Sequence, residues 1–200
     1  MEFSCFSSKS VWRHNALENG EHVAFNSILS AITSNLDGNK WRKPQEGILK
    51  CILNSFWINK QSMCGGAWIV RDIGQAKHHA RDAFTPIQDR TGAELCCILR
   101  SLKAFQDIHV SKVIIELEYP AAVNAVLQPS KWPFYRNWLA QIHEIAGAFE
   151  SCTFRHIATN ANLIARSISR SVIQERRFQS YIALGEPSWF HNQVFEESKV

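Results

Sequence analysis

The spacing of apolar residues divides the chain into a first part with strand-like patterns and a second part in which helices and strands alternate. Between residues 41 and 84, three short segments are rich in apolar residues and are separated by polar turns, which predicts an antiparallel meander. From residue 91 onward, helical spacing alternates with short β-branched runs. The predicted strands are 48–58, 64–71, 76–84, 112–118 and 149–157, and the predicted helices are 91–105, 120–127, 134–147 and 160–178.

The connection between the two parts predicts the class of fold. The strand at 112–118 follows directly after the helix at 91–105, and a strand–helix–strand crossover of this kind favours parallel pairing. The sequence therefore predicts an α/β fold with a mixed five-stranded sheet, in which three antiparallel strands are followed by parallel strands and helices flank the sheet. Thr91 and Glu94, three residues apart, have the form of a capping box at the start of the first helix.

Residues 1–40 precede this pattern and are polar at first and then weakly amphipathic. Ile28 and Ile32 are expected on one face of a short helix over 21–34. The Asp-Gly pair within 35–40 predicts a turn or linker. We expect three parts, namely an N-terminal extension over 1–40, a domain over 41–181 and a C-terminal tail over 182–200.

The charge of the chain is unevenly distributed. With 200 residues, 46% of them hydrophobic, the chain is large enough for one domain with a core. The formal net charge of +4 permits nucleic-acid binding but does not require it. Between residues 155 and 177, however, five arginines face a single acid, Glu175. This excess predicts a basic strip for nucleic acid, formed by Arg155, Arg170 and Arg177.

The cysteines and the apolar runs bear on the cellular compartment. None of the six cysteines has CxxC spacing, and the adjacent pair Cys96 and Cys97 would point about 100° apart on a helix, which makes a zinc site unfavourable. We expect reduced, mostly buried thiols. The first fifteen residues lack the apolar stretch of a signal peptide, and no apolar run is long enough to span a bilayer. The sequence therefore predicts an intracellular protein of the nucleus or cytoplasm that is not secreted and has no membrane partner.

Short motifs placed along this framework carry a resemblance to a known family. Gly65-Gly66 opens the second strand, Ala93-Glu94 opens the first helix, and His156 precedes the last helix. The other matching residues are Trp41, Pro44, Gly47, Lys50, Cys51, Trp68, Asp72, Gly74, Val113, Glu116, Glu118, Asn162, Ala165, Tyr181, Gly185, Pro187 and Trp189. Over roughly residues 41–189, the chain resembles the plant reverse-transcriptase-like ribonuclease H family, whose domains derive from non-LTR retroelements. The resemblance implies a ribonuclease H-like fold.

The resemblance also implies a catalytic centre in which four acids bind two Mg²⁺ ions, with the RNA strand of an RNA–DNA hybrid as the substrate. Paired ions activate a water molecule and stabilise the leaving oxygen. The matching positions in this chain are Asn54, Glu94, Glu118 and Arg166. Two of them keep a carboxylate, so Glu94 and Glu118 are the expected ligands if any metal binds. Mg²⁺ is the expected cofactor of an active enzyme, and otherwise no cofactor is expected.

The other two positions argue against hydrolysis. The amide of Asn54 is uncharged and replaces a bridging carboxylate poorly. The guanidinium of Arg166 repels Mg²⁺ and is expected to pair with Glu94 or Glu118, or to join the basic strip if it faces solvent. Four acids would give a charge of −4, whereas the residues present give −1. Glu116 shares a strand face with Glu118, so one of these two acids could be a solvated charge at the strand end.

Two further groups are weaker candidates for a role at the site. His156, ahead of the last helix, could shuttle protons in an active enzyme. Trp132 and Trp138 lie around a loop with two prolines, where Lys131 and Arg136 would complete a basic-aromatic surface for a nucleic-acid backbone. The alternative is that at least one of these rings packs in the core, as we expect for Trp68 on the second strand.

Three functions therefore stay open. The charge count favours a nucleic-acid-binding ribonuclease H-like domain with a degraded two-metal site. The alternatives are an active Mg²⁺-dependent ribonuclease of RNA–DNA hybrids, and a decayed domain used only for protein interaction. The predicted partner is nucleic acid, as a hybrid or a duplex, and the sequence indicates no particular protein partner or oligomeric state.

Overall fold

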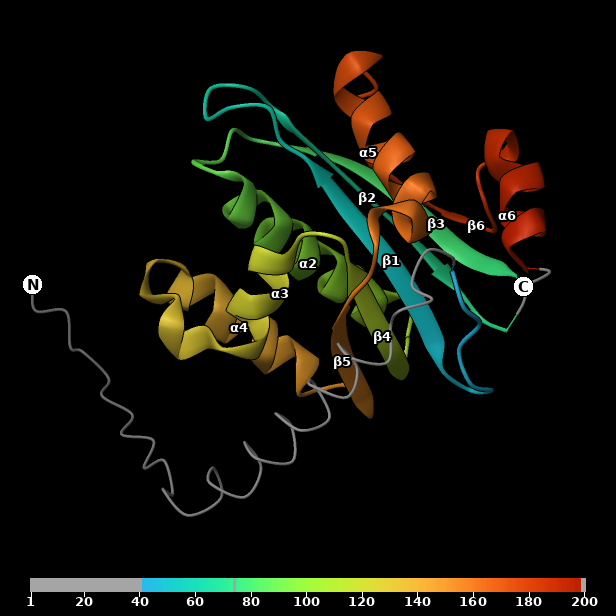
Figure 1. Cartoon of the computed structure of the whole chain (residues 1–200), viewed down its shortest axis with the longest axis horizontal. Coiled ribbons are helices and arrows are strands. Elements are labelled where there is room, and N and C mark those ends of the chain that lie inside the picture. Colours follow the sequence, from blue (N-terminus) through green and yellow to red (C-terminus); the bar gives the residue numbers. More distant parts are fainter. Residues whose placement is uncertain (1–40, 74, 199–200) are drawn as a thin grey trace, which may run out of the picture. The chain divides into compact units, whose positions relative to one another are not determined.

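A six-stranded mixed sheet organises the residues that the computed structural model describes, which are 41–73 and 75–198 (Figure 1). Its order is β5-β4-β1-β2-β3-β6. β1, β2, β3 and β6 form successive antiparallel pairs, whereas β4 pairs parallel with both β1 and β5. The predicted α/β class and mixed sheet are confirmed. The strands are β1 (Leu49–Phe56), β2 (Cys64–Arg71), β3 (Ala76–Phe84), β4 (Lys112–Leu117), β5 (Ser151–His156) and β6 (Tyr181–Leu184).

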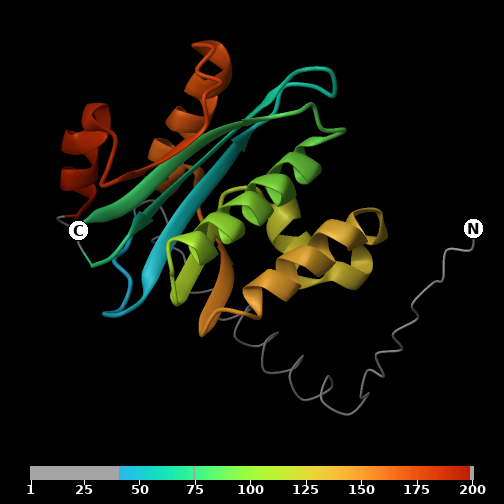
Figure 2. The ribbon, with the colours of Figure 1, turned by 180° about the vertical axis from the view of Figure 1, so that it is seen from behind.

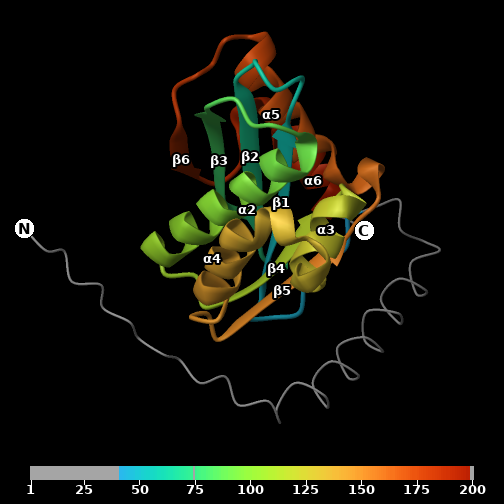
Figure 3. The same cartoon turned by 90° about the vertical axis from the view of Figure 1, so that its left-hand side faces the viewer.

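Helices lie on both faces of the sheet, as Figures 1 and 3 show. Three of them, α2 (Arg90–Asp107), α3 (Pro120–Leu127) and α4 (Arg136–Ala146), cover one face, and α5 (Leu163–Gln174) covers the other. α6 (His191–Ser198) follows β6. Short 3-10 turns lie at Pro129–Lys131, Pro133–Tyr135, Thr159–Asn162 and Ser188–Phe190. None of the described helices is long and apolar enough to cross a membrane. The helix expected over 21–34 lies outside the described residues.

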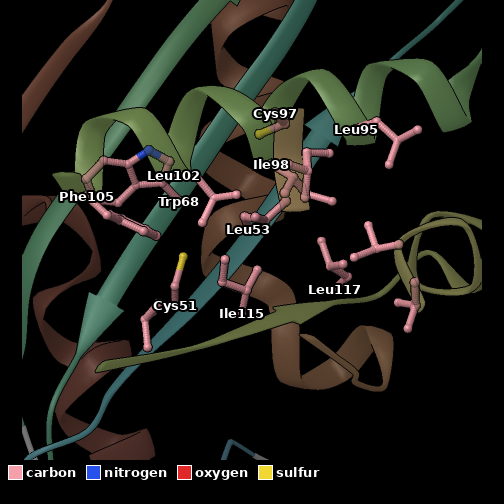
Figure 4. Close-up of a cluster of buried hydrophobic side chains, with 14 of the residues drawn as sticks. Cys51, Leu53, Trp68, Leu95, Cys97, Ile98, Leu102, Phe105, Ile115 and Leu117 are labelled. Carbon is pink, nitrogen blue, oxygen red and sulfur yellow. The ribbon is translucent and has the colours of Figure 1, made fainter. Parts of the chain in front are cut away.

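The alternation of side chains along the strands divides the core residues between the two faces of the sheet. Leu53 and Trp68 point toward α2 and pack with its apolar face, where the Trp68 and Phe105 rings meet edge to face with centroids 5.0 Å apart (Figure 4). Figure 2 shows α2 crossing the sheet on this side. Ile52, the neighbour of Leu53, points to the other face and packs beneath α5 with Ile168. Trp68 is 5% exposed, so its predicted place in the core is confirmed.

The sixth strand was not predicted. β6 spans only four residues, and its side chains are half-buried or exposed in alternation, so no apolar run marks it. It pairs antiparallel with β3 and extends the sheet by one strand. Val194 of α6 is buried in the core beneath α5. Residues of the predicted tail over 182–200 thus contribute both to the sheet and to its packing.

The structure explains two of the helix ends that differ from the prediction, the start of α2 and the end of α5. α2 begins at Arg90, one residue early, because the Asp89 side chain caps it by accepting a hydrogen bond of 2.8 Å from the Gly92 amide. The capping box of Thr91 and Glu94 is therefore wrong, since both residues lie inside the helix. α5 ends at Gln174 rather than 178, because the next turn places a non-glycine residue in the left-handed region, at a φ of 54°.

Candidate functional site

Parallel strand pairing brings two of the four matching positions together. The pairing of β1 with β4 ends at Leu53 and Leu117, and the next residue along the chain is in each case a matching position, Asn54 on β1 or Glu118 just beyond β4. The carboxyl ends of parallel neighbours lie at the same edge of a sheet. The helices α2 and α5 then approach this edge from opposite faces of the sheet.

Asn54 is held by α5. Its side chain is 2% exposed, and its Oδ1 accepts a hydrogen bond of 2.7 Å from the hydroxyl of Ser169, which is fully buried. This contact satisfies a polar group that burial would otherwise leave without a partner. The amide of Asn54 therefore joins the sheet to the helix, and one of its acceptor sites is already used.

Glu94 approaches the end of β1 from α2. The residue is 1% exposed, and its Oε2 accepts a hydrogen bond of 3.3 Å from the Ser55 amide. Burial raises the pKa of this carboxyl to about 8, and the nearby Glu118 adds to the rise, while Arg90 and Ser55 oppose it. At neutral pH the carboxyl is therefore mostly protonated and contributes little negative charge.

Glu118 is the centre of the charged contacts. Its side chain is 5% exposed, and its Oε1 lies 3.5 Å from Nη2 of Arg90 and 3.8 Å from Nη1 of Arg166. Its Oε2 accepts a hydrogen bond of 3.4 Å from the side-chain amide of Asn162. The side chains of the two arginines are 43% and 46% exposed, so they lie between the buried carboxylate and solvent. The expected pairing of Arg166 with a carboxylate is present, and its partner is Glu118.

The neighbouring acid on β4 is not solvated either. Glu116 is 6% exposed, and its Oε1 lies 3.0 Å from Nζ of Lys50 in a buried ion pair. Lys50 in turn donates to the backbone oxygen of Arg42 at 2.6 Å. The hypothesis that Glu116 or Glu118 is a solvated strand-end charge is therefore wrong. Glu116 has a partner of its own and takes no part in the contacts around Glu118.

His156 contacts the site through the backbone of Glu118. Its Nε2 is 3.2 Å from the backbone oxygen of Glu118, and its side chain is exposed. The ring thus contacts the backbone of the residue that carries the carboxylate. A proton-shuttling role stays a prediction, and it has meaning only for an active hydrolase.

Two residues at the site, Arg90 and Ser169, were missed from the sequence, and Asn162 was counted among the matching residues without a predicted role at the site. Arg90 stands four residues before Glu94, and this helical spacing signals that both side chains lie on one face of α2. Ser169 follows Ile168 on the apolar face of α5, where a polar residue needs a buried partner. Asn162, which is 0% exposed, donates to the Leu53 backbone oxygen at 3.1 Å as well as to Glu118, and nothing in its spacing marks this bridge.

The residues present do not fit a pair of Mg²⁺ ions. Mg²⁺ prefers several hard, charged oxygen ligands. Asn54 is occupied by Ser169, Glu94 is mostly protonated at neutral pH, and Glu118 is paired with two guanidiniums. Among residues 41–73 and 75–198, no three His, Cys, Asp or Glu side chains are grouped to hold a metal, and the five cysteines in this part of the chain are free.

The structure distributes the predicted basic strip over several places. Arg155 lies on the edge strand β5, opposite Glu116 of β4. The guanidinium of Arg170 is 5.8 Å from the Phe56 ring centroid, near the end of β1. Arg177 pairs with Glu175 and stacks on Trp189 of the C-terminal segment. Among the described residues, Arg166 is the arginine of the segment 155–177 that contacts Glu118.

In the loop around the two prolines, the two tryptophan rings pack against the core and a different aromatic ring is exposed. The rings of Trp132 and Trp138 are half-buried and pack against the core, and Trp132 donates to the Asn124 side chain at 2.9 Å. Phe134 between them is 76% exposed, and Lys131 and Arg136 are exposed as well. The exposed ring of this basic-aromatic surface is therefore Phe134 rather than either tryptophan.

Known proteins share this arrangement of strands and helices. Residues 54–172 match the model of a family described as reverse transcriptase-like. A comparison with curated protein sequences gives no match. Among solved structures, ribonuclease H1 from the halophilic archaeon Halobacterium salinarum aligns at 12% identity with a TM-score of 0.58, over 64% of this chain and 98% of that one.

Two further structures have the same fold. LC11 ribonuclease H1, isolated from compost by a metagenomic approach and solved in complex with an RNA/DNA hybrid, aligns at 16% identity with a TM-score of 0.58, over 64% of this chain and 99% of its own. The N-terminal ribonuclease H domain of a Mycobacterium tuberculosis protein aligns at 11% identity with a TM-score of 0.55, over 64% and 96%. At these identities the likeness shows the ribonuclease H fold, as the sequence predicted.

Proposed function

We propose that this chain, which belongs to the reverse transcriptase-like family, is a nucleic-acid-binding ribonuclease H-like domain that does not hydrolyse its ligand through metal ions. The observation that carries the proposal is the pairing of Glu118 with Arg90 and Arg166, at 3.5 and 3.8 Å. The two guanidiniums lie where the family resemblance implies Mg²⁺, and they make the edge of the sheet attractive to phosphate rather than to a cation.

Charge and fold support nucleic acid as the ligand. Two guanidiniums and one carboxylate leave the contacts around Glu118 with a net charge of +1, because Glu94 is mostly protonated at neutral pH. The whole chain carries +4. A positive surface attracts the phosphate backbone with little regard to sequence. A protein of the same fold is known in complex with an RNA/DNA hybrid, which favours a hybrid or a duplex as the first ligand to test.

The remaining parts of the proposal concern origin and compartment. The motifs of the sequence favour a plant protein derived from a non-LTR retroelement, and the proposed compartment is the nucleus or cytoplasm. Both parts are independent of the binding activity.

The binding test uses a labelled RNA–DNA hybrid and a range of salt concentrations. We expect the dissociation constant to rise steeply with salt, because each phosphate that a cation neutralises contributes about 0.9 to the slope of log K against log salt. Replacing the basic strip, Arg155, Arg170 and Arg177, by alanine should weaken binding and flatten that slope. A matched variant replaces three exposed lysines, Lys43, Lys60 and Lys103, and removes the same charge.

The results separate the three functions. If the wild-type protein does not bind at low salt, or binds with a flat salt response, the proposal is wrong and the domain is better explained by protein interaction. Equal losses in the two triple variants would show that net charge alone attracts the nucleic acid. Cleavage of the hybrid in Mg²⁺ would favour the active ribonuclease, for which the two carboxylates at 94 and 118 are the supporting observation.

A further inference from the structure

The exposure of the side chains around Glu118 increases from the interior toward solvent. The Glu118 side chain is 5% exposed, whereas the side chains of Arg90 and Arg166 are 43% and 46% exposed. Arg90 comes from the first residue of α2 and Arg166 from the first turn of α5, so the two cations reach one carboxylate from opposite faces of the sheet. Any group that approaches from solvent therefore meets guanidinium before it meets Glu118.

We propose that Arg90 and Arg166 together bind a phosphodiester group of the nucleic-acid backbone at this edge of the sheet, without a metal ion. The inference rests on the proposed function and specifies how that ligand is held. Glu118 is then a positioning residue, because it holds both guanidiniums from behind and does not contact the ligand.

The geometry leaves donors available for a phosphate. A guanidinium has five N–H donors in a planar fork, and the contact to Glu118 at 3.5 or 3.8 Å is made by one terminal nitrogen of each arginine. Arginine forks bind phosphate oxygens in pairs, through charge-assisted hydrogen bonds. The remaining donors of two guanidiniums that share one carboxylate can therefore contact one tetrahedral anion from two directions.

The orientation of Arg90 is fixed by a second contact. Its guanidinium lies over the ring of Tyr119, 4.3 Å from the centroid, directly beyond Glu118 along the chain. Stacking on an aromatic face suits the planar guanidinium and costs it few donors, because these point outward in the plane of the group. A cation that is held by a ring and a carboxylate loses less conformational entropy when a phosphate binds.

The charge balance agrees with this assignment. Glu118 offsets only one of the two guanidiniums. Arg90, which the count of −1 made from the sequence did not include, adds one positive charge to this edge of the sheet.

The experiment measures hybrid binding by fluorescence anisotropy for the wild type and for single variants, in EDTA and during a Mg²⁺ titration. Arg90→Ala and Arg166→Ala should each weaken binding about fivefold to tenfold, the size of one partly exposed charge-assisted contact, and lower the salt slope by about 0.9. Arg166→Lys, which keeps the charge and loses the fork, should fall between. Glu118→Gln should tighten binding, because the amide keeps the shape of the side chain behind both arginines while the negative charge that competes with phosphate is removed.

Lys103→Ala is the matched control. It removes one exposed cation from the same helix as Arg90, thirteen residues away, or about 20 Å along α2. This variant should bind within twofold of the wild type. Thermal melting of each variant checks that the fold is intact, which we expect because both arginines are nearly half exposed.

Each outcome decides the inference. If the wild type binds the hybrid and both arginine variants bind like Lys103→Ala, the phosphate is not held here, although the proposed function stands. If Mg²⁺ tightens wild-type binding and Glu118→Gln abolishes that effect, a metal holds the phosphate and the inference is wrong. If the wild type does not bind at all, the inference and the proposed function fail together.

Discussion

The buried carboxyl of Glu94 makes the stability of this domain depend on pH in a way that one substitution can isolate. The residue is 1% exposed, and burial raises its pKa from 4.5 to about 8. Between these two pH values the native state keeps a proton that the unfolded chain has released. Stability therefore falls as pH rises through this range and levels off above the folded pKa.

The size of the effect follows from the width of that range. Each pH unit between the two pKa values lowers the free energy of unfolding by about 1.4 kcal/mol. The loss is therefore about 3 kcal/mol at pH 7 and about 5 kcal/mol above pH 8. Glu94→Gln removes the ionisation but places an amide where Oε1 has no hydrogen-bond partner among the described residues, which costs about 1–3 kcal/mol. We expect the variant to be less stable than the wild type at pH 5 and more stable above pH 8, with the two curves crossing at about pH 6.

The assay is urea unfolding followed by tryptophan fluorescence, at pH values from 5 to 9. The control is Glu144→Gln, at an exposed position of α4, whose curve should run parallel to that of the wild type. A Glu94→Gln curve that also runs parallel to the wild type over the whole range would refute the reasoning, because it would mean that Glu94 is ionised in the native state.

Three further changes test the packing around the site. Ser169→Ala leaves the buried amide on β1 without its donor and should cost about 1–3 kcal/mol in urea unfolding, with an unchanged m-value. Lys50→Met leaves Glu116 buried without its cation and should cost about 3–5 kcal/mol, most of which the double change with Glu116→Gln should recover; no recovery would refute the ion-pair account. Gly65→Ala places a methyl group against the backbone oxygen of the residue at 169 and should lower the melting temperature. The control, Gly66→Ala, meets only side-chain atoms at 3.0 Å or beyond and should lower it less. Equal losses in the two variants would contradict the close packing of α5 on β2.

Where strong local signals existed, the sequence predicted the fold closely. The strands Cys64–Arg71 and Ala76–Phe84 and the helix Pro120–Leu127 have the predicted bounds, because turn residues or a proline mark their ends. Tyr181–Leu184 was missed, because four half-exposed residues carry no periodic signal and pair with β3 only through tertiary structure. The start of α2 was misplaced, because Asp89 and Thr91 are both acceptable caps and the sequence does not choose between them.

The candidate site could be predicted only in part. The resemblance gave the four matching positions, and strand order explains why Asn54 and Glu118 lie at one edge. The contact of Arg90 with Glu118 depends on how α2 packs on the sheet, and the protonation of Glu94 depends on the depth of its burial. Both are tertiary effects, and together they change the sign of the local charge.

The most direct test of the central claim is to incubate the protein in excess over an end-labelled RNA–DNA hybrid with Mg²⁺ and to run native and denaturing gels side by side. We predict a hybrid that is shifted on the native gel and intact on the denaturing gel, because the guanidiniums at Glu118 bind phosphate without the two ions that cleavage requires. Cleavage that depends on Mg²⁺ and is lost in Glu118→Gln would contradict the account.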